Sequence, residues 1–161
     1  MGERDDSADV VIARDDPRAE DVRLLLQTHL AFSRDVTPAE YSFALDAEGL
    51  SDPGVPLFCA RHNGELLGIG ALKRHDDTHA ELKSMHTREA ARGRGVGRAM
   101  VEHLLAVARE HGYRRVSLET GTTDDFAAAR ALYTTAGFQP CAAFGGYRPS
   151  AYNTFMTICL D

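Results

Sequence analysis

The sequence lacks any apolar run that approaches the roughly 18 residues needed to span a membrane. Its start, MGERDD, has one arginine among three acidic residues and so lacks the basic start and apolar stretch of a signal peptide, and Asp6 stands where a myristoylation signal needs Ser or Thr. We therefore expect a cytoplasmic protein with no membrane partner. With 161 residues, 43% of them hydrophobic, the chain suits one domain with a sizeable core. We assign residues 1–7 to a solvated tail and 8–161 to that domain.

Cysteine is scarce, and no metal-binding pattern stands out. The three cysteines, Cys59, Cys141 and Cys159, are odd in number and form no C-x-x-C pair. We expect buried free thiols in a reducing cytoplasm rather than disulfides or a zinc site. The segment His75-Asp76-Asp77-Thr78-His79 has two histidines but no further ligand cluster, which is more typical of a solvated turn. We expect no metal cofactor.

Positive charge is scarce overall and concentrated in one segment. The formal net charge of −6 argues against nucleic acid as the main partner. Between residues 81 and 100, five basic side chains against two acidic ones leave a local charge of +3: Lys83, Arg88, Arg92, Arg94 and Arg98 against Glu81 and Glu89. Such a run often marks only a solvated face. Its overlap with three glycines, at positions 93, 95 and 97, favours a binding site for an anion.

Helical and strand periodicities alternate along the chain. The dipeptide Asn63-Gly64 between two apolar runs predicts a β-hairpin, and Gly112 and Gly137 each end a helix. The patterns predict strands at 8–14, 57–61, 66–72, 80–86, 115–120, 138–141 and 152–160. They predict a helix that starts near Pro17, a short helix at 39–45, a helix that runs from 96 to Gly112, and a helix that is capped by Asp124 or Asp125 and ends at 136. One β-α-β crossover then gives an α/β (α+β) domain with a mixed sheet.

The three glycines lie where a strand ends and a helix begins. Glycine inside an element costs roughly 1 kcal/mol relative to alanine, so three so close together need a local reason. The first amides of a helix have no intrahelical acceptor, and glycines let a phosphate approach them without interference from Cβ. A Walker loop would need Gly-Lys-Ser/Thr, and a dinucleotide fingerprint would need Gly or Ala where Arg98 or Met100 stands.

The stretch RGRGVG, residues 92–97, resembles the acetyl-CoA pyrophosphate loop of the GNAT N-acetyltransferase superfamily, Gln/Arg-x-x-Gly-x-Gly/Ala, at all three signature positions. Further along, ARALYTTAGF, residues 129–138, matches the family's A-x-x-L-Y-x-x-x-G-F. The predicted order of helices and strands agrees with that of the family over roughly residues 9–160. The segments ELKSM, SLETG and FGGYRP are similar to sequences of the bacterial YsnE-like branch. One position departs from the family, which often has asparagine three residues before Ala129, where this chain has Phe126.

The resemblance implies the GNAT fold, a mostly antiparallel mixed sheet of six to seven strands with about four helices. It implies acetyl-CoA as co-substrate and a primary amine of a small molecule or peptide as acceptor, and it leaves a homodimer open. It places acetyl-CoA against two motifs and the strand before them: Met85, His86, Thr87, Arg92, Gly93, Arg94, Gly95, Val96, Gly97, Arg98, Ala129 and Tyr133. Arg88 is a further candidate for the phosphates, and backbone amides near Met85 and His86 for the pantetheine arm and the oxyanion.

The implied reaction requires a base, because an alkyl amine with a pKa of about 10 is neutral in roughly one molecule per thousand at pH 7. Glu81 lies eleven residues before Arg92, the same distance from the glycine loop as the general base of histone-acetylating members of the superfamily. Its alternative role is an ion pair with a basic side chain. Glu119 on the neighbouring strand is the second candidate and His86 the third. Tyr133 is the expected proton donor to the leaving thiolate.

The acceptor is the least determined part of this interpretation. Its specificity would lie in residues 33–56 and 142–151, which no motif interprets. The loop FGGYRP, residues 144–149, is either a plain glycine-rich turn or a loop that covers the bound acceptor. In the second case Arg148 could contact a carboxylate of the substrate. A non-catalytic CoA-binding protein of the same fold is the alternative function. The glycine loop fits both functions, whereas Tyr133 and the carboxylates favour the enzyme.

Overall fold

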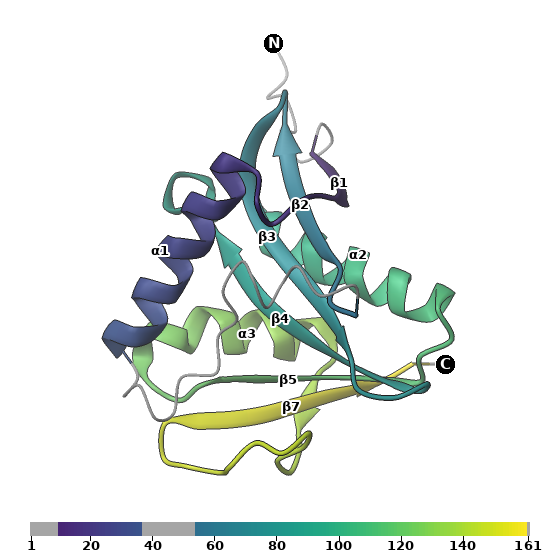
Figure 1. The fold of residues 1–161 in the computed structure, drawn as a ribbon. Coiled ribbons are helices and arrows are strands. Elements are labelled where there is room, and N and C mark those ends of the chain that lie inside the picture. The colour runs from purple at the N-terminus through teal and green to yellow at the C-terminus, as the bar shows by residue number, and fades with distance from the viewer. Residues whose placement is uncertain (1–9, 37–53, 161) are drawn as a thin grey trace.

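The computed structural model describes residues 10–36 and 54–160. Within these residues a seven-stranded mixed sheet, ordered β1-β2-β3-β4-β5-β7-β6, is flanked by three α-helices (Figure 1). The strands are β1 Val11–Arg14, β2 Leu57–His62, β3 Glu65–Arg74, β4 His79–Thr87, β5 Arg115–Gly121, β6 Gln139–Pro140 and β7 Asn153–Cys159. The helices are α1 Glu20–Val36, α2 Val96–Glu110 and α3 Ala127–Ala136, and the 3-10 turns η4 Glu89–Ala91 and η5 Asp124–Phe126 precede α2 and α3.

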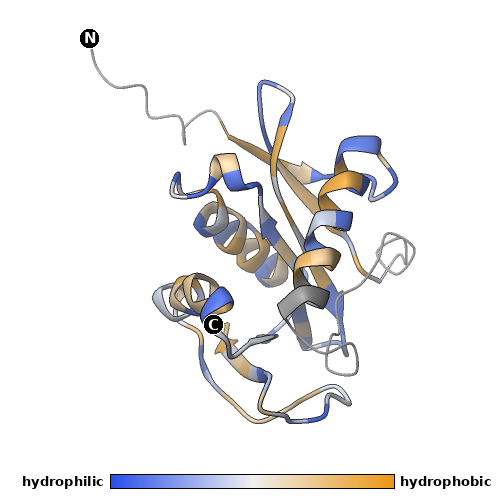
Figure 2. Cartoon of the chain, turned by 90° about the vertical axis from the view of Figure 1, so that its left-hand side faces the viewer, coloured by the Kyte–Doolittle hydropathy of each residue, from blue (hydrophilic) through white to orange (hydrophobic). Residues whose placement is uncertain are grey.

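The two faces of the sheet follow from the alternation of side chains along its strands. In β2, Leu57 and Cys59 join the core formed with α1, whereas Phe58 and Ala60 join the larger core formed with α2. The α1 core takes Val22, Leu25 and Leu26 from that helix, and the α2 core takes Met100, Val101, Leu104, Leu105 and Ala108. Figure 2 shows apolar strips along α2 and the central strands, and hydrophilic residues at the hairpin turn.

The strands β4 and β5 separate part-way along the sheet. They are joined through α2 and pair in parallel, whereas every other neighbouring pair is antiparallel. Their pairing ends at Leu82 opposite Leu118, although β4 continues to Thr87 against β3 and β5 continues to Gly121 against β7. Beyond that point the two strands diverge (Figure 1), so the backbone groups along their facing edges no longer bond to each other.

A β-bulge accompanies the separation. Ile69 of β3 lies opposite His86, but Ala71 lies opposite Lys83, so β4 has one extra residue in this interval. Ser84 takes a left-handed backbone conformation there, with φ at 56°. Such a φ is uncommon for a residue with a side chain, and a bulge is one way in which a strand re-aims its side chains beside an active site.

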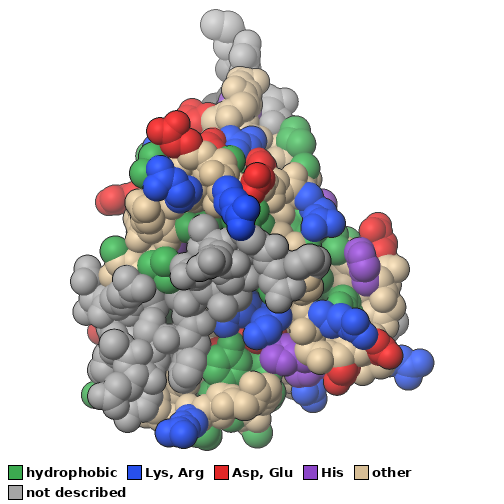
Figure 3. Space-filling view, viewed as in Figure 1, with side chains coloured by type: hydrophobic (Ala, Val, Ile, Leu, Met, Phe, Trp, Pro, Cys, Tyr) green, Lys and Arg blue, Asp and Glu red, His purple; other side chains and the backbone are tan. Residues whose placement is uncertain are grey.

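Charged side chains fix α1 against the sheet. Arg61 of β2 lies 3.0 Å from Asp15 after β1 and 2.6 Å from Asp21 in the first turn of α1. The hydrogen bond from Arg61 lowers the pKa of Asp21 below its usual value. On the face that Figure 3 shows, acidic and basic side chains are intermixed over the described residues. No helix among residues 10–36 and 54–160 is both long and apolar enough to span a bilayer.

The fold confirms the predicted fold class, the hairpin around Asn63-Gly64 and the β-α-β crossover. The helix predicted at 39–45 lies outside the described residues. The predicted aspartate cap is wrong: Asp124 and Asp125 form the 3-10 turn, and Phe126, with no side-chain hydrogen bond, occupies the N-cap of α3. The three cysteines are free, but burial was predicted correctly for Cys59 alone, because Cys141 is half-buried and Cys159 is exposed.

Candidate active-site cleft

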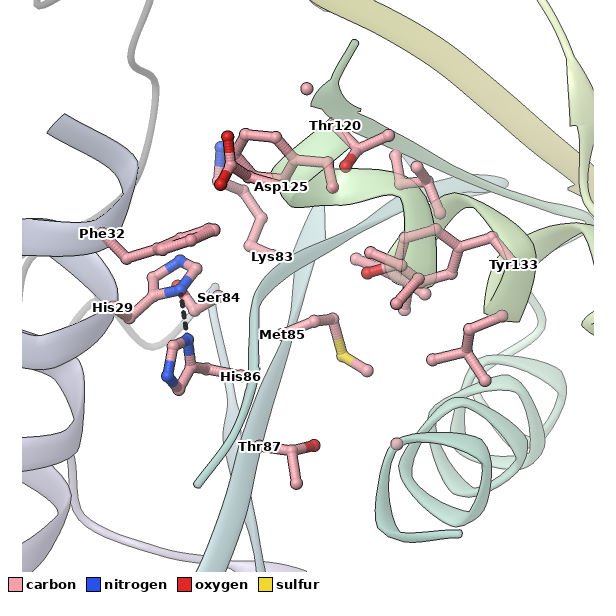
Figure 4. Close-up of a pocket in the computed structure, with 18 of the residues that line it drawn as sticks. His29, Phe32, Lys83, Ser84, Met85, His86, Thr87, Thr120, Asp125 and Tyr133 are labelled. Atoms are coloured by element: carbon pink, nitrogen blue, oxygen red, sulfur yellow. Dashed lines mark hydrogen bonds between the residues drawn. The ribbon is translucent and has the colours of Figure 1, made fainter. Parts of the chain in front are cut away.

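A cavity of about 500 Å³ opens where β4 and β5 diverge, and we call it the β4–β5 cleft. Its walls are the two strands, the C-terminal part of α1, the start of α2 and one side of α3 (Figure 4). Most of the predicted site residues line it, whereas Arg88, Arg94 and Arg148 do not; those that line it are Glu81, Met85, His86, Thr87, Arg92, Gly93, Gly95, Val96, Gly97, Arg98, Glu119, Ala129 and Tyr133. Tertiary structure thus gathers four distant sequence segments in one cavity.

The glycines at the start of α2 have two different structural reasons. Gly93 and Gly95 have φ at 76° and 81°, which favours glycine, and a Cβ on either would meet nothing within 4 Å. Gly95 is the N-cap, and no side chain caps the helix there. At Gly97 an added Cβ would lie 3.1 Å from Leu132 of α3, so this glycine allows the two helices to pack closely. The first residues of α2 line the cleft, and amides at the start of a helix have no intrahelical acceptor.

The arginines around this loop divide into two groups. Arg92 and Arg98 line the cleft, with Arg92 Nε 3.4 Å from the Thr87 carbonyl oxygen and Arg98 Nε 3.2 Å from Glu102. Arg88, a candidate for the phosphates, lies outside the cleft and donates instead to the Leu66 carbonyl at 3.2 Å. The start of α2 thus combines two basic side chains with the positive end of the helix dipole.

Tyr133 reaches the cleft from α3, with its hydroxyl directed into the cavity (Figure 4). The residue is only 6% exposed, and burial raises the pKa of its hydroxyl above the usual 10. The phenol therefore keeps its proton at neutral pH. Among the described residues this hydroxyl has no hydrogen-bond partner, so the proton is available to a ligand.

Glu81 and Glu119 lie on adjacent strands but in different environments. Glu81 is 1% exposed, and both of its oxygens are engaged: Oε1 lies 2.7 Å from His75 Nε2, and Oε2 accepts a hydrogen bond from the Tyr147 hydroxyl at 2.5 Å. Burial raises the pKa of Glu119 to about 7, against the opposing effect of the Lys83 charge. Glu119 Oε2 is buried and has no partner within the described part of the chain.

Tyr147 and His75 are functional neighbours that the sequence did not reveal. Lys83 Nζ donates to the Tyr147 hydroxyl at 2.6 Å, which fastens the loop 144–149 to β4. The prediction of a solvated turn is wrong for His75, whose side chain is 17% exposed and packs against Glu81 and Phe144. Arg148 is exposed and does not line the cleft. No local motif signals the contact of Tyr147 with Glu81 and Lys83, which lie more than sixty positions away in the sequence.

The α1 side of the cleft is formed by rings. His29 and His86 lie with their Nδ1 atoms 3.1 Å apart, and burial lowers both pKa values to about 4, so the pair is neutral at pH 7. A base with so low a pKa has little affinity for a proton from an amine, which argues against His86 as the general base. Phe126, which replaces the family's asparagine, packs its ring on Gly121 and edge-on against Phe32.

The described residues contain no group of three His, Cys, Asp or Glu side chains that could hold a metal ion. The profile of the Acetyltransferase (GNAT) family matches residues 22–138.

The chain belongs to the GNAT acetyltransferase family. Two relatives named as uncharacterised N-acetyltransferases are 38% identical to it: YedL of Escherichia coli over 149 residues (92% of this chain, 94% of YedL) and YsnE of Bacillus subtilis over 143 residues (89% and 95%). A third relative, named IAA acetyltransferase, from Azospirillum brasilense, is 34% identical over 149 residues (91% and 95%).

Solved structures share the GNAT fold of this chain. One from Klebsiella pneumoniae, assigned as an acyl-CoA N-acyltransferase, has a TM-score of 0.77 at 26% identity, with 94% of this chain and 98% of that one covered. An acetyltransferase from Bacillus subtilis in complex with CoA has a TM-score of 0.72 at 16% identity, with 94% and 99% covered. GNAT enzymes use acetyl-CoA as co-substrate, and this chain is an acetyl-CoA-dependent N-acetyltransferase.

The open space at Gly95 leads to a prediction about CoA affinity. We expect Gly95→Asp to weaken CoA binding about tenfold or more, because it sets a negative charge beside the start of α2, where the diphosphate would lie. Isothermal titration calorimetry with CoA measures the change. The matched control is Gly64→Asp, since Gly64 has φ at 82°, equally open space and a place in the distant hairpin turn. Equal affinity in the two variants would contradict the placement of the diphosphate.

Proposed function

We propose that the protein transfers the acetyl group of acetyl-CoA to a primary amine of a small molecule or peptide by direct attack on the thioester. The observation that carries this proposal is the content of the β4–β5 cleft. One cavity joins free helix amides, a phenol that keeps its proton and a carboxyl group whose pKa is raised to about 7. The amides can bind the diphosphate of the acetyl donor, the phenol can protonate the leaving thiolate, and the carboxyl group can take a proton from the ammonium ion.

The donor would lie along the diverging half of β4. In this proposal the diphosphate accepts hydrogen bonds from the amides of residues 93–97, with Arg92 and Arg98 beside it. The pantetheine arm runs along Met85 to Thr87, whose outer backbone edge is not paired with β5. A backbone amide at the bulge would stabilise the oxyanion that forms when the amine attacks the carbonyl carbon. This places the thioester between β4 and Tyr133.

Glu119 is the general base in this proposal. It removes one proton from the bound ammonium and releases that proton to solvent, and the neutral nitrogen then attacks the carbonyl carbon while the carboxylate is ionised again. As the carbon–sulfur bond breaks, Tyr133 protonates the thiolate and recovers its proton from the nitrogen, so one proton leaves for solvent with each turnover. Glu81 is less suited to this role, because His75 and Tyr147 occupy its oxygens. We assign Glu81 to holding the loop 144–149 and Lys83 in place.

The test of the function is a transfer assay on a panel of amines with acetyl-CoA. The panel contains short alkyl amines, arylalkyl amines, polyamines, amino acids, a peptide with a free α-amine and a lysine peptide. IAA, which the name of the Azospirillum relative indicates, is assayed beside the panel as an acceptor that is not a primary amine. We expect acetylated product from at least one primary amine. CoA binding without transfer to any member would instead support the alternative, a CoA-binding protein that does not turn over.

The base assignment predicts a pH profile. The carboxylate must be ionised to act, so kcat/KM of the wild type should fall as the pH drops through about 7. Glu119→Gln should lower kcat/KM about a hundredfold at pH 7.5 and remove this limb of the profile. It should unfold at no lower temperature, because Gln mimics the neutral carboxyl that burial favours.

The matched control is Glu81→Gln. Because its carboxylate binds Tyr147 and His75, this variant should lose stability. It should keep the limb of the pH profile but shift it below pH 7, because the Glu81 charge no longer raises the pKa of Glu119. Loss of the limb in Glu81→Gln, with its retention in Glu119→Gln, would make Glu81 the base.

The acid assignment predicts a defect that depends on pH. Tyr133→Phe should reduce kcat about tenfold at pH 7 and leave CoA affinity unchanged, since the thiolate loses its proton donor. Above about pH 8.5 a free thiolate is stable without a proton, so the defect should narrow there. Steady-state kinetics from pH 6.5 to 9.5 measure it. Tyr113→Phe, outside the cleft, is the control, and a defect that is constant with pH would contradict this role.

Location and assembly are part of the same proposal. We propose a cytoplasmic protein, which the three free cysteines support, since a reducing compartment keeps thiols free. A homodimer, common in this superfamily, is a prediction that analytical ultracentrifugation tests.

A further inference from the structure

Two buried side-chain oxygens among the described residues have no hydrogen-bond partner, Ser84 Oγ and Glu119 Oε2. Both residues line the β4–β5 cleft, one on each of the diverging strands. Buried polar atoms without partners are rare because they lose the hydrogen bonds of water without replacement. Since both lie in one cavity, a polar group of a ligand bound there would satisfy them together.

The backbone of Ser84 points to the same conclusion. The residue is 7% exposed and is held at a φ of 56° in the bulge, a conformation that L residues adopt with strain. Ser84 follows Leu82 by two residues in β4, and the pair of Leu82 with Leu118 is the last one between β4 and β5. In Figure 4 Ser84 lies on the α1 side of β4, beside His29 and Phe32, whereas Met85 points to the opposite side, toward Tyr133. The bulge therefore aims the Ser84 hydroxyl away from the predicted pantetheine path.

We propose that Ser84 is a positioning residue for the acceptor: its Oγ and Glu119 Oε2 each accept one N–H of a primary amine. This inference rests on the proposed function. A neutral primary amine has two N–H groups and one lone pair. When two fixed oxygens accept the two N–H groups, the lone pair has one direction left, toward the thioester carbonyl. Orientation of this kind accelerates the attack. A secondary amine has one N–H and cannot satisfy both oxygens.

The test compares two serines on neighbouring strands. Ser117 is fully buried, like Ser84, but its Oγ is satisfied by His79 Nε2 at 2.7 Å and Thr157 Oγ1 at 2.8 Å. Ser84→Ala should unfold at the same or a higher temperature than wild type, because it removes an unpaired polar atom. Ser117→Ala should lower Tm by roughly 2–4 °C, because it removes the two hydrogen bonds that the buried Ser117 hydroxyl makes. Both variants should bind CoA as wild type does.

The kinetic readout uses the panel's best primary amine and the N-methyl derivative of that amine. For Ser84→Ala we expect kcat/KM with the primary amine to fall about tenfold. The ratio of kcat/KM for the primary amine to kcat/KM for the N-methyl amine should also fall about tenfold. Ser117→Ala should keep both values within about twofold. Ser84→Gly, which relieves the positive φ, should raise Tm and show the same kinetic loss as Ser84→Ala.

Each outcome supports or overturns the inference. Unchanged kcat/KM and preference in Ser84→Ala would overturn it while the proposed function stands. A drop in Tm like that of Ser117→Ala would also overturn it, because the hydroxyl would then be a structural group. If the wild type acetylates no amine of the panel, the proposed function fails and this inference fails with it.

Discussion

The site depends on one constraint, the end of backbone pairing between β4 and β5. Two parallel strands bonded along their full length would leave no room between them and no free amides. Because pairing stops at Leu82 opposite Leu118, the remaining residues of each strand keep a bonded neighbour on one side only. The free edge of β4 can then bind an extended ligand as another strand would. The crossover helix α2 starts beside the same opening, so its N-terminal amides and the free edge belong to one cavity.

Side-chain alternation then divides the chemistry between the two faces of these strands. Leu82 and Leu118 turn to the core under α2, whereas their neighbours Glu81 and Glu119 turn to the opposite face. On that face Glu81 is enclosed by hydrogen bonds from the loop, and Glu119 is desolvated with one oxygen unpaired. Two chemically similar residues thereby acquire different properties, because the pKa of a carboxyl group follows its surroundings and not its position in the sequence.

The departures from ordinary protein structure gather in this cleft. Ser84 has a positive φ, two buried oxygens lack partners, and the buried Tyr133 hydroxyl has none among the described residues. Each lowers the stability of the fold to a small degree. Elsewhere, as in the hairpin at Asn63-Gly64, local preference and tertiary structure agree. Strain confined to one cavity is what a site prepared for a ligand would show.

The sequence by itself determined most of the described helices and strands, the mixed sheet with its single crossover and the glycine loop at the start of α2. Those features follow from local rules: apolar periodicity, a turn dipeptide, and the positive φ that Gly93 and Gly95 adopt. The two motifs and the strands beside them also named about half of the residues that line the cleft. Only the tertiary structure decided which carboxylate has an unpaired oxygen, why Gly97 must be small, that Tyr147 and His75 contact Glu81, and that Ser84 lines the cleft. The reason is physical: desolvation and hydrogen-bond satisfaction depend on groups brought together from distant segments, and no local pattern records which groups those are.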